Sequence, residues 1–237
     1  MTAPISTNWR DGIRLLTFDL DDTLIDTDGI APERVADAIE VARTLLGPDA
    51  VDYEAVHAAV VATNPVSPGR AATMLRLLGV DPTHEYAARI REAYGRRLVD
   101  LVRPFPETIE VLTALRERVR IGIVSNGPET LQGAKLARCG LAGLVDVVVF
   151  SGAFGVDKPD ARIFAHACAL AGVAVEAAAH VGDSVLADIA GARAAGMHTI
   201  WRRPPHREEP VGEGAPPDLV IDELRELLDL FPPRLPR

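Results

Sequence analysis

Five aspartates fall within ten residues, directly after an apolar stretch of the chain. The run 15–18 reads Leu-Leu-Thr-Phe and predicts a buried strand, and Asp19 and Asp21 follow where that strand would end. Carboxylates this close repel one another, so such a cluster favours folding only when a cation lies among them. A calcium loop of the EF-hand type is excluded, because its sixth and twelfth positions counted from Asp19 hold Leu24 and Ile30. A solvated acidic turn is the alternative interpretation of this cluster taken alone.

Polar residues also follow three later apolar runs that predict strands. They are Ser125 and Asn126 after 119–124, Lys158 in the loop after 145–150, and Asp183, Ser184 and Asp188 after 178–181. Open parallel sheets bind ligands beyond the carboxyl ends of their strands. Each polar residue alone has an ordinary explanation, such as an Asn-Gly turn, an exposed loop lysine or a helix N-cap. Acids, a hydroxyl and a lysine from four strand ends at one edge indicate a site instead.

The elements that must position these residues alternate along most of the chain. Strand-like runs at 119–124, 145–150, 178–181, 198–201 and 219–221 are separated by helical patterns at 107–118, 128–139, 160–171 and 185–195, and a last helix ends at 230. Such alternation predicts a parallel sheet covered by helices on both faces. We therefore expect an α/β fold with a doubly wound parallel sheet that begins with the strand before Asp19.

The segment from residue 32 to residue 103 has a different character. Helical patterns at 32–46, 53–61, 69–78 and 83–102 follow one another with no convincing strand between them. We expect a small helical bundle inserted into the sheet domain. The predicted boundaries give a core domain of residues 1–26 and 104–237 and a helical domain of residues 27–103.

Composition argues against several classes of protein. The formal net charge of −9 disfavours nucleic acid or an anionic membrane as the main partner. The longest apolar run, 167–175, is too short to span a bilayer, and residues 1–14 lack the apolar core of a signal peptide. Cys139 and Cys168 have no spacing typical of a disulfide framework or a zinc site. We expect a cytoplasmic protein that is a monomer or a homodimer.

Four motifs occur in order along the chain: Asp19-Leu20-Asp21-Asp22-Thr23, then Ser125, then Lys158 before Pro159, and finally Gly182-Asp183-Ser184 with Asp188. In this order and at strand ends they resemble the four motifs of phosphohydrolases of the haloacid dehalogenase (HAD) superfamily, which include DxDxT and GDSxxxD. The resemblance covers residues 13–230 apart from the helical insertion. An insertion between the first two motifs is the C1-capped arrangement of that superfamily. The resemblance therefore implies a Rossmann-like HAD core with a helical cap domain that closes over the site.

The same resemblance implies a phosphatase that uses Mg²⁺. Asp19 would be the nucleophile that forms an aspartyl-phosphate, and Asp21 would act as general acid and base. The Mg²⁺ ion would bind the carboxylates of Asp19 and Asp183 and the main-chain carbonyl of Asp21. The residues that would hold the phosphoryl group are Ser125, Asn126 and Lys158. The residues that would orient these groups and the metal ligands without contacting the substrate are Thr23, Ser184 and Asp188.

Three function classes fit the resemblance: a phosphatase, a phosphomutase of the β-phosphoglucomutase kind, and a catalytically silent binding protein. Dehalogenating members of the superfamily carry a tyrosine where Asp21 stands, so the chemistry of phosphate esters is favoured over dehalogenation. The intact acids argue against a silent protein, because nothing but catalysis or metal binding requires so repulsive a cluster.

Two stretches, one between Ser125 and Phe164 and one from Trp201 through Pro217, resemble bacterial pyrimidine 5′-nucleotidases of the superfamily. We therefore predict a nucleoside 5′-monophosphate substrate, with pyrimidines preferred, and a sugar phosphate or phosphoglycolate as the alternative. Arg70 is a candidate cation for binding that substrate. The aromatic side chains of the predicted cap that could face a base are Tyr53, Tyr86 and Tyr94.

Overall fold

The computed structural model describes residues 9–63, 69–204 and 216–232. The chain divides into two compact units: a core unit of residues 1–25 and 104–237, and a helical unit of residues 26–103. Where the chain passes between the two units, the short strands β2 (Ile25–Asp26) and β3 (Arg103–Pro104) pair as a two-stranded sheet. Part of the second nucleotidase-like stretch, residues 205–215, lies outside the described residues.

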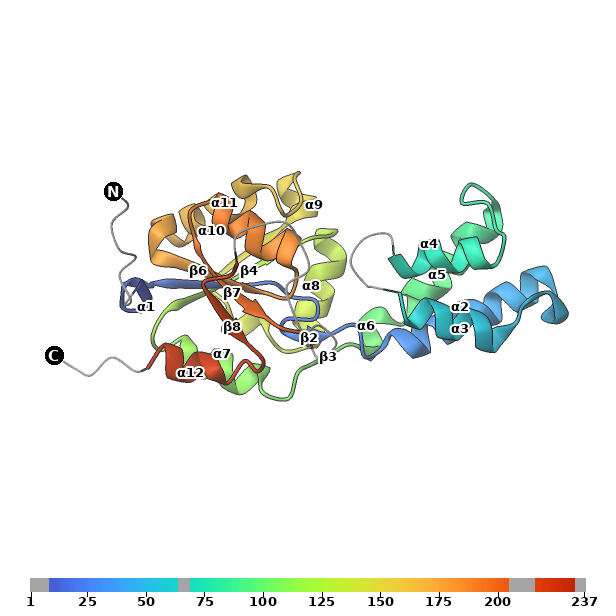
Figure 1. Ribbon diagram of the computed structural model, residues 1–237, viewed down its shortest axis with the longest axis horizontal. Coiled ribbons are helices and arrows are strands. Elements are labelled where there is room, and N and C mark those ends of the chain that lie inside the picture. The colour runs from blue at the N-terminus through green and yellow to red at the C-terminus, as the bar shows by residue number, and fades with distance from the viewer. Residues whose placement is uncertain (1–8, 64–68, 205–215, 233–237) are drawn as a thin grey trace. The chain divides into compact units, whose positions relative to one another are not determined.

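A six-stranded sheet forms the middle of the core unit (Figure 1). Its strands are β1 (Leu15–Phe18), β4 (Arg120–Ser125), β5 (Val147–Phe150), β6 (Ala178–Gly182), β7 (His198–Arg202) and β8 (Leu219–Ile221), in the spatial order β5-β4-β1-β6-β7-β8. All neighbouring strands are parallel, and β1 lies between β4 and β6. All four residues of β1 are buried, because helices cover both faces of the sheet. The predicted α/β class with a doubly wound parallel sheet is confirmed.

Helices cover the two faces of this sheet (Figure 1). On one face lie α10 (Ala161–Ala171) and α11 (Gly191–Ala194), and on the other lie α7 (Thr108–Leu115) and α12 (Glu226–Leu230). The other helices of the core unit are α1 (Trp9–Gly12), α8 (Glu129–Arg138) and α9 (Ser151–Phe154), with 3₁₀ turns at Ala142–Leu144 and Val175–Ala177. Ile163 and Phe164 of α10 belong to a buried apolar cluster with Leu15 of β1 and Val124 of β4. This packing fixes the strand ends from which the polar residues project.

The predicted helix over 185–195 is two elements in the structure. A π-helical segment, η4 (Val185–Ala190), comes first, and α11 follows it. The π-helical turn, which is wider than an α-helical turn, begins at Ser184. Its carbonyl oxygen accepts hydrogen bonds from the backbone N–H groups of both Asp188 and Ile189, at 2.9 and 3.2 Å. Short π-helical segments of this kind are frequent at functional sites.

The helical unit has an apolar core of its own. Its helices are α2 (Ala31–Leu46), α3 (Tyr53–Val61), α4 (Gly69–Leu77), α5 (Glu85–Arg96) and α6 (Leu98–Leu101), with a 3₁₀ turn at Pro48–Ala50. Val35, Val56, Met74 and Ile90, from four different helices, lie in one buried cluster. The single helix predicted over 83–102 is divided between α5 and α6 close to Gly95, a residue of low helix propensity. None of the described helices is both long enough and apolar enough to cross a membrane.

Candidate active site

A buried lysine joins two aspartates at the carboxyl edge of the sheet. Asp19 follows β1 directly, and Asp188 lies in η4 after β6. The Nζ atom of Lys158 donates to Asp19 Oδ1 at 2.5 Å and to Asp188 Oδ1 at 2.6 Å. All three residues are buried, Asp188 most completely at 1% exposure. An unpaired charge in such a place has a large desolvation penalty, and the two carboxylates that Lys158 binds offset that penalty for the lysine.

Asp188 is held in place by its surroundings. Its Oδ2 atom accepts a hydrogen bond from the backbone N–H of Ser184 at 2.9 Å, and its Oδ1 atom lies 3.2 Å from His180 Nε2. His180 is fully buried, and its Nδ1 atom lies 2.9 Å from the hydroxyl of Thr17 in β1. A Cβ atom on Gly182 would overlap the carboxyl group of Asp188, so only glycine permits this approach. The acid that anchors Lys158 is therefore itself rigidly positioned.

Asp19, Asp183 and Asp188 form an acidic cluster that can hold a metal ion. One carboxylate oxygen of each lies within 4.8 Å of the other two. The buried carboxylate of Asp183 accepts no hydrogen bond from any residue that the structure describes. A buried carboxylate that lacks a partner is unfavourable, so this donor atom fits a bound cation. Carboxylate oxygens are ligands that Mg²⁺ prefers.

The main chain of Asp183 is fixed from the neighbouring strand. The indole N–H of Trp201 donates to the Asp183 carbonyl oxygen at 2.8 Å. This contact follows from the parallel register, in which Trp201 of β7 is the partner of Gly182 in β6. Ser184, next along the chain, caps η4 by accepting a hydrogen bond from the N–H of Ala187 at 3.1 Å. Hydrogen bonds to the Asp183 carbonyl oxygen and to the Ser184 side chain thus fix the backbone from which the Asp183 side chain projects.

The acids of the cluster differ in how readily they ionise. Burial raises the pKa of Asp19 to about 7, an effect that Lys158 partly offsets and Asp188 increases. Burial and the charges of Asp188 and Asp19 raise the pKa of Asp183 well above its usual range. Burial acts on Asp188 in the same direction, but Lys158 and His180 outweigh it and lower the pKa of that carboxyl. Asp19 and Asp183 therefore resist ionisation unless positive charge is added to the site.

The loops after β4 and β5 are joined by a reciprocal pair of hydrogen bonds. The Nδ2 atom of Asn126 donates to the carbonyl oxygen of Lys158 at 3.1 Å, and the N–H of Lys158 donates to Asn126 Oδ1 at 2.8 Å. Asn126 therefore positions the Lys158 backbone, and its predicted contact with substrate stays a prediction. Ser125, the last residue of β4, is buried at the same edge, and its hydroxyl accepts a hydrogen bond from Gln132 at 2.7 Å.

Asp21 is bound by two side chains from α8 that no motif includes. The Nζ atom of Lys135 lies 2.5 Å from Asp21 Oδ1 and 2.6 Å from Oδ2, and it donates to this carboxylate. The Nε2 atom of Gln132 donates to Asp21 Oδ2 at 3.0 Å. Lys135 is 4% exposed, whereas the Asp21 side chain keeps 30% of its surface exposed. Asp21 is thus oriented from one side and open on the other.

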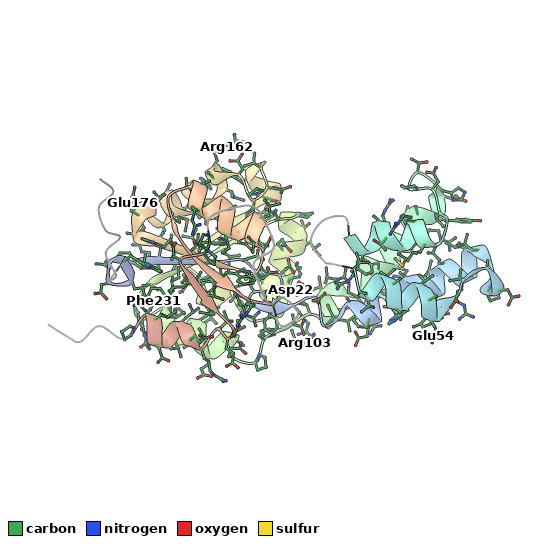
Figure 2. The ribbon with its side chains drawn as sticks, viewed as in Figure 1. Asp22, Glu54, Arg103, Arg162, Glu176 and Phe231 are labelled. Atoms are coloured by element: carbon green, nitrogen blue, oxygen red, sulfur yellow. The ribbon has the colours of Figure 1, made fainter. Side chains whose placement is uncertain are left out.

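The rest of the acidic loop is tied to the end of β7. Asp22, labelled in Figure 2, has a left-handed backbone with φ 58°, a conformation that aspartate tolerates better than most residues. Arg202 donates to the Asp22 carbonyl oxygen at 2.8 Å while its guanidinium lies 3.8 Å from the centre of the Phe105 ring. Thr23 is fully buried, and its hydroxyl has no hydrogen-bond partner within the described residues. Its predicted supporting role stays a prediction.

Arg70 lies in the helical unit, on α4, and is buried there. Its guanidinium forms an ion pair with Asp28 and donates to the carbonyl oxygen of Val61 at 3.3 Å. These contacts give Arg70 a structural part within the helical unit. Its predicted contact with substrate stays a prediction.

Four residues outside the motifs therefore take part in the site: Gln132, Lys135, His180 and Trp201. Helical spacing indicates only that Gln132 and Lys135 share a face of α8, and gives no hint of what they contact. One signal in the sequence could have identified Lys135. The chain has 25 lysines and arginines, and only Lys135 and Lys158 are lysines. Both bind aspartates of this site.

Residues 13–196 match the family described as haloacid dehalogenase-like hydrolase. Over 226 residues the chain is 34% identical to glyceraldehyde 3-phosphate phosphatase of Methanopyrus kandleri, which covers 92% of this chain and 97% of that protein. Over 224 residues it is 31% identical to pyrimidine 5′-nucleotidase YjjG of Escherichia coli, covering 90% of this chain and 96% of that protein. The crystal structure of a HAD phosphatase from Thermococcus onnurineus has the same fold, with a TM-score of 0.64 at 24% identity, covering 92% and 97% of the two chains.

Proposed function

Because this chain belongs to the haloacid dehalogenase-like hydrolase family, we propose that it is a Mg²⁺-dependent phosphatase of small phosphate monoesters. The observation that carries the proposal is the buried set of Asp19, Lys158, Asp183 and Asp188 at the carboxyl edge of the sheet. Hydrolysis of phosphate monoesters is among the slowest uncatalysed reactions, and catalysis depends on positioning and on offsetting negative charge. Lys158 places a positive charge among acids that require a further cation to ionise, and such a site can offset the negative charge of a phosphate ester.

The proposed reaction has two steps on Asp19. In the first, a carboxylate oxygen of Asp19 attacks phosphorus, the bond between phosphorus and the ester oxygen breaks, and Asp21 gives a proton to the departing oxygen. In the second, water attacks the aspartyl-phosphate, Asp21 takes a proton from that water, and inorganic phosphate leaves while the Asp19 carboxylate is restored. Lys158 and the hydroxyl of Ser125 lie at the same edge, where they would hold phosphoryl oxygens.

The residues that would hold Mg²⁺ are Asp19 and Asp183 through their carboxylates and Asp21 through its main-chain carbonyl. When bound, the ion neutralises phosphoryl oxygens and favours the ionised form of Asp19. With all four carboxylates ionised, Asp19, Asp21, Asp183 and Asp188 together with Lys135 and Lys158 have a formal charge of −2, which a divalent cation offsets. Asp188 is less available as a ligand, since Lys158, His180 and the Ser184 N–H already occupy its oxygens.

The proposed function is tested with p-nitrophenyl phosphate as a general substrate. We expect phosphate release to require Mg²⁺ and to stop on chelation with EDTA. We expect Asp19→Asn to abolish turnover with the fold intact, because the amide cannot attack phosphorus. The exposed residue Arg225, which pairs with Glu110 in the core unit, gives a control, and Arg225→Ala should retain full activity. Full activity of the chelated protein, or of Asp19→Asn, excludes the proposed function.

The substrate we propose first is a nucleoside 5′-monophosphate, with pyrimidines preferred, which the relationship to the Escherichia coli nucleotidase supports. The second candidate is a short sugar phosphate such as glyceraldehyde 3-phosphate, supported by the relative from Methanopyrus kandleri. The helical unit bears on this choice. Its tyrosines pack, partly buried, against its own apolar core, and each contacts a neighbouring side chain: Tyr53 contacts His57, Tyr86 contacts His84, and Tyr94 contacts Arg34.

Rings that are already engaged offer less surface to a base, and this is the observation that supports keeping the smaller sugar phosphate as the second candidate. A panel of CMP, UMP, AMP, glyceraldehyde 3-phosphate and phosphoglycolate, assayed by phosphate release, separates the candidates through kcat/KM. If either of the last two exceeds every nucleotide, the nucleotidase assignment is removed and the phosphatase assignment stands. A phosphomutase would convert a sugar phosphate to its isomer and release little phosphate.

A further inference from the structure

The two lysines of this chain are its most informative basic residues. Of 25 basic residues, 23 are arginines, so this sequence uses arginine almost wherever a positive charge is needed. The exceptions are Lys158, which occupies a family motif, and Lys135, which belongs to none. Both lysines are buried and both bind carboxylates of the site. At both positions the compact ammonium group lies within 2.6 Å of two carboxylate oxygens.

The contacts of Lys135 show why an ammonium group suits this position. Its Nζ atom lies within 2.6 Å of both carboxylate oxygens of Asp21, and the lysine is 4% exposed. A guanidinium group is planar and larger, and it would need more space at the end of the same buried helix face. Gln132, one turn earlier on α8, donates to the same carboxylate and also to Ser125 and to the Asn126 carbonyl oxygen. These contacts from α8 therefore hold the Asp21 carboxylate in a single orientation.

We infer that Lys135 is a positioning residue for Asp21. It holds the Asp21 carboxylate in the orientation in which that group can transfer protons to and from the reacting oxygens. The inference rests on the proposed function, in which Asp21 transfers those protons. Lys135 is too deeply buried to touch the substrate, while the open side of Asp21 remains accessible. General acid–base catalysis depends on placing the group within hydrogen-bond reach of the proton, so a freely rotating Asp21 would lose much of its effect.

The test uses two substrates that differ mainly in their leaving group. The leaving group of p-nitrophenyl phosphate is activated and needs little protonation, whereas benzyl phosphate releases an alkoxide that must receive a proton. We expect Lys135→Met to lower kcat/KM for benzyl phosphate by roughly 10- to 100-fold, within the range of general acid–base effects, and to change kcat/KM for p-nitrophenyl phosphate by less than about threefold. The ratio kcat/KM is compared because it reports the step in which the leaving group departs, and not the hydrolysis of the aspartyl-phosphate that both substrates share. Asp21→Asn should show the same selectivity, and Asp21→Asn with Lys135→Met should lose no more than Asp21→Asn alone.

The controls separate positioning from stability. Arg138 lies one turn further along α8 and is exposed, so Arg138→Met removes a charge from the same helix and should leave both rates unchanged. Lys135→Gln is the second variant, because its amide keeps a polar group in the buried position if Lys135→Met folds poorly. Equal losses of kcat/KM on the two substrates, or losses of kcat/KM that add to those of Asp21→Asn, would overturn the inference. A wild-type protein that hydrolyses neither ester would overturn the proposed function as well, so the two failures are distinguishable.

Discussion

Replacing Asp19 with asparagine should stabilise the metal-free protein while it destroys activity. Asp19 is buried beside Asp188 and Asp183, and its pKa is raised from 3.8 to about 7, chiefly by burial. An acid whose pKa is higher in the folded state binds its proton more tightly there than in the unfolded chain. The stability that this proton contributes is therefore fully present below pH 4 and is lost as the pH rises from about 4 to about 7. An asparagine side chain at this position would have no charge to bury at any pH.

The size of the effect follows from that shift. Each pKa unit corresponds to about 1.4 kcal/mol, so ionising Asp19 in the folded state costs at most about 4 kcal/mol at pH 8. At pH 5 the unfolded chain is already ionised and the folded site is not, and the cost is about 1.5 kcal/mol. The difference in the free energy of unfolding between Asp19→Asn and wild type should therefore grow by roughly 2–3 kcal/mol from pH 5 to pH 8.

The assay is urea denaturation of both proteins in EDTA at pH 5 and pH 8, followed by circular dichroism. Comparing the proteins at each pH cancels the ionisable groups that lie away from the site. Asp183 does not cancel, because the charge of Asp19 raises its pKa; removing that charge eases the ionisation of Asp183 and increases the expected difference in the same direction. Adding Mg²⁺ should reverse the order at pH 8, because the ion stabilises the wild-type cluster more than one that has lost a carboxylate. An Asp19→Asn protein that is less stable than wild type in EDTA, or a stability difference that is equal at both pH values, would refute the electrostatic reasoning.

Three further predictions follow from the contacts around the site. Gly182→Ala should displace the Asp188 side chain, because the new Cβ would overlap its carboxyl group; we expect kcat to fall at least about tenfold and stability to fall by roughly 1–3 kcal/mol, measured with p-nitrophenyl phosphate and by urea denaturation. Trp201→Phe keeps an aromatic side chain but removes the indole N–H that donates to the Asp183 carbonyl oxygen, and it leaves a cavity because Trp201 is buried; Mg²⁺ affinity measured by calorimetry should weaken and the unfolding free energy should fall by about 1–3 kcal/mol. Arg70→Ala removes a buried arginine that pairs with the more exposed Asp28, and it should lower stability by about 1–3 kcal/mol; unchanged relative kcat/KM across the substrate panel would remove the predicted role of Arg70 in substrate binding.

The class of fold and the identity of the acids could be predicted from the sequence because both have local signatures. Apolar runs of strand length alternate with helical patterns, and this alternation leaves a parallel sheet as the arrangement that buries every strand. In such a sheet the carboxyl ends of the strands share one edge, so Asp19, Ser125, Lys158 and Asp183 could be assigned to it before any contact was known. The spatial order β5-β4-β1-β6-β7-β8 agrees with that assignment.

The partners of those acids were decided by the tertiary structure alone. Lys135 is 114 residues from Asp21 in the chain, and they meet because β4 lies beside β1 and brings α8 to the same edge. His180 reaches Asp188 beneath the site, and Trp201 reaches the Asp183 carbonyl oxygen because β7 lies beside β6. Periodicity in a sequence records which face of a helix or strand is buried, because burial is a property of each element. Which group that face meets depends on strand order and register, and these are set when the elements pack together.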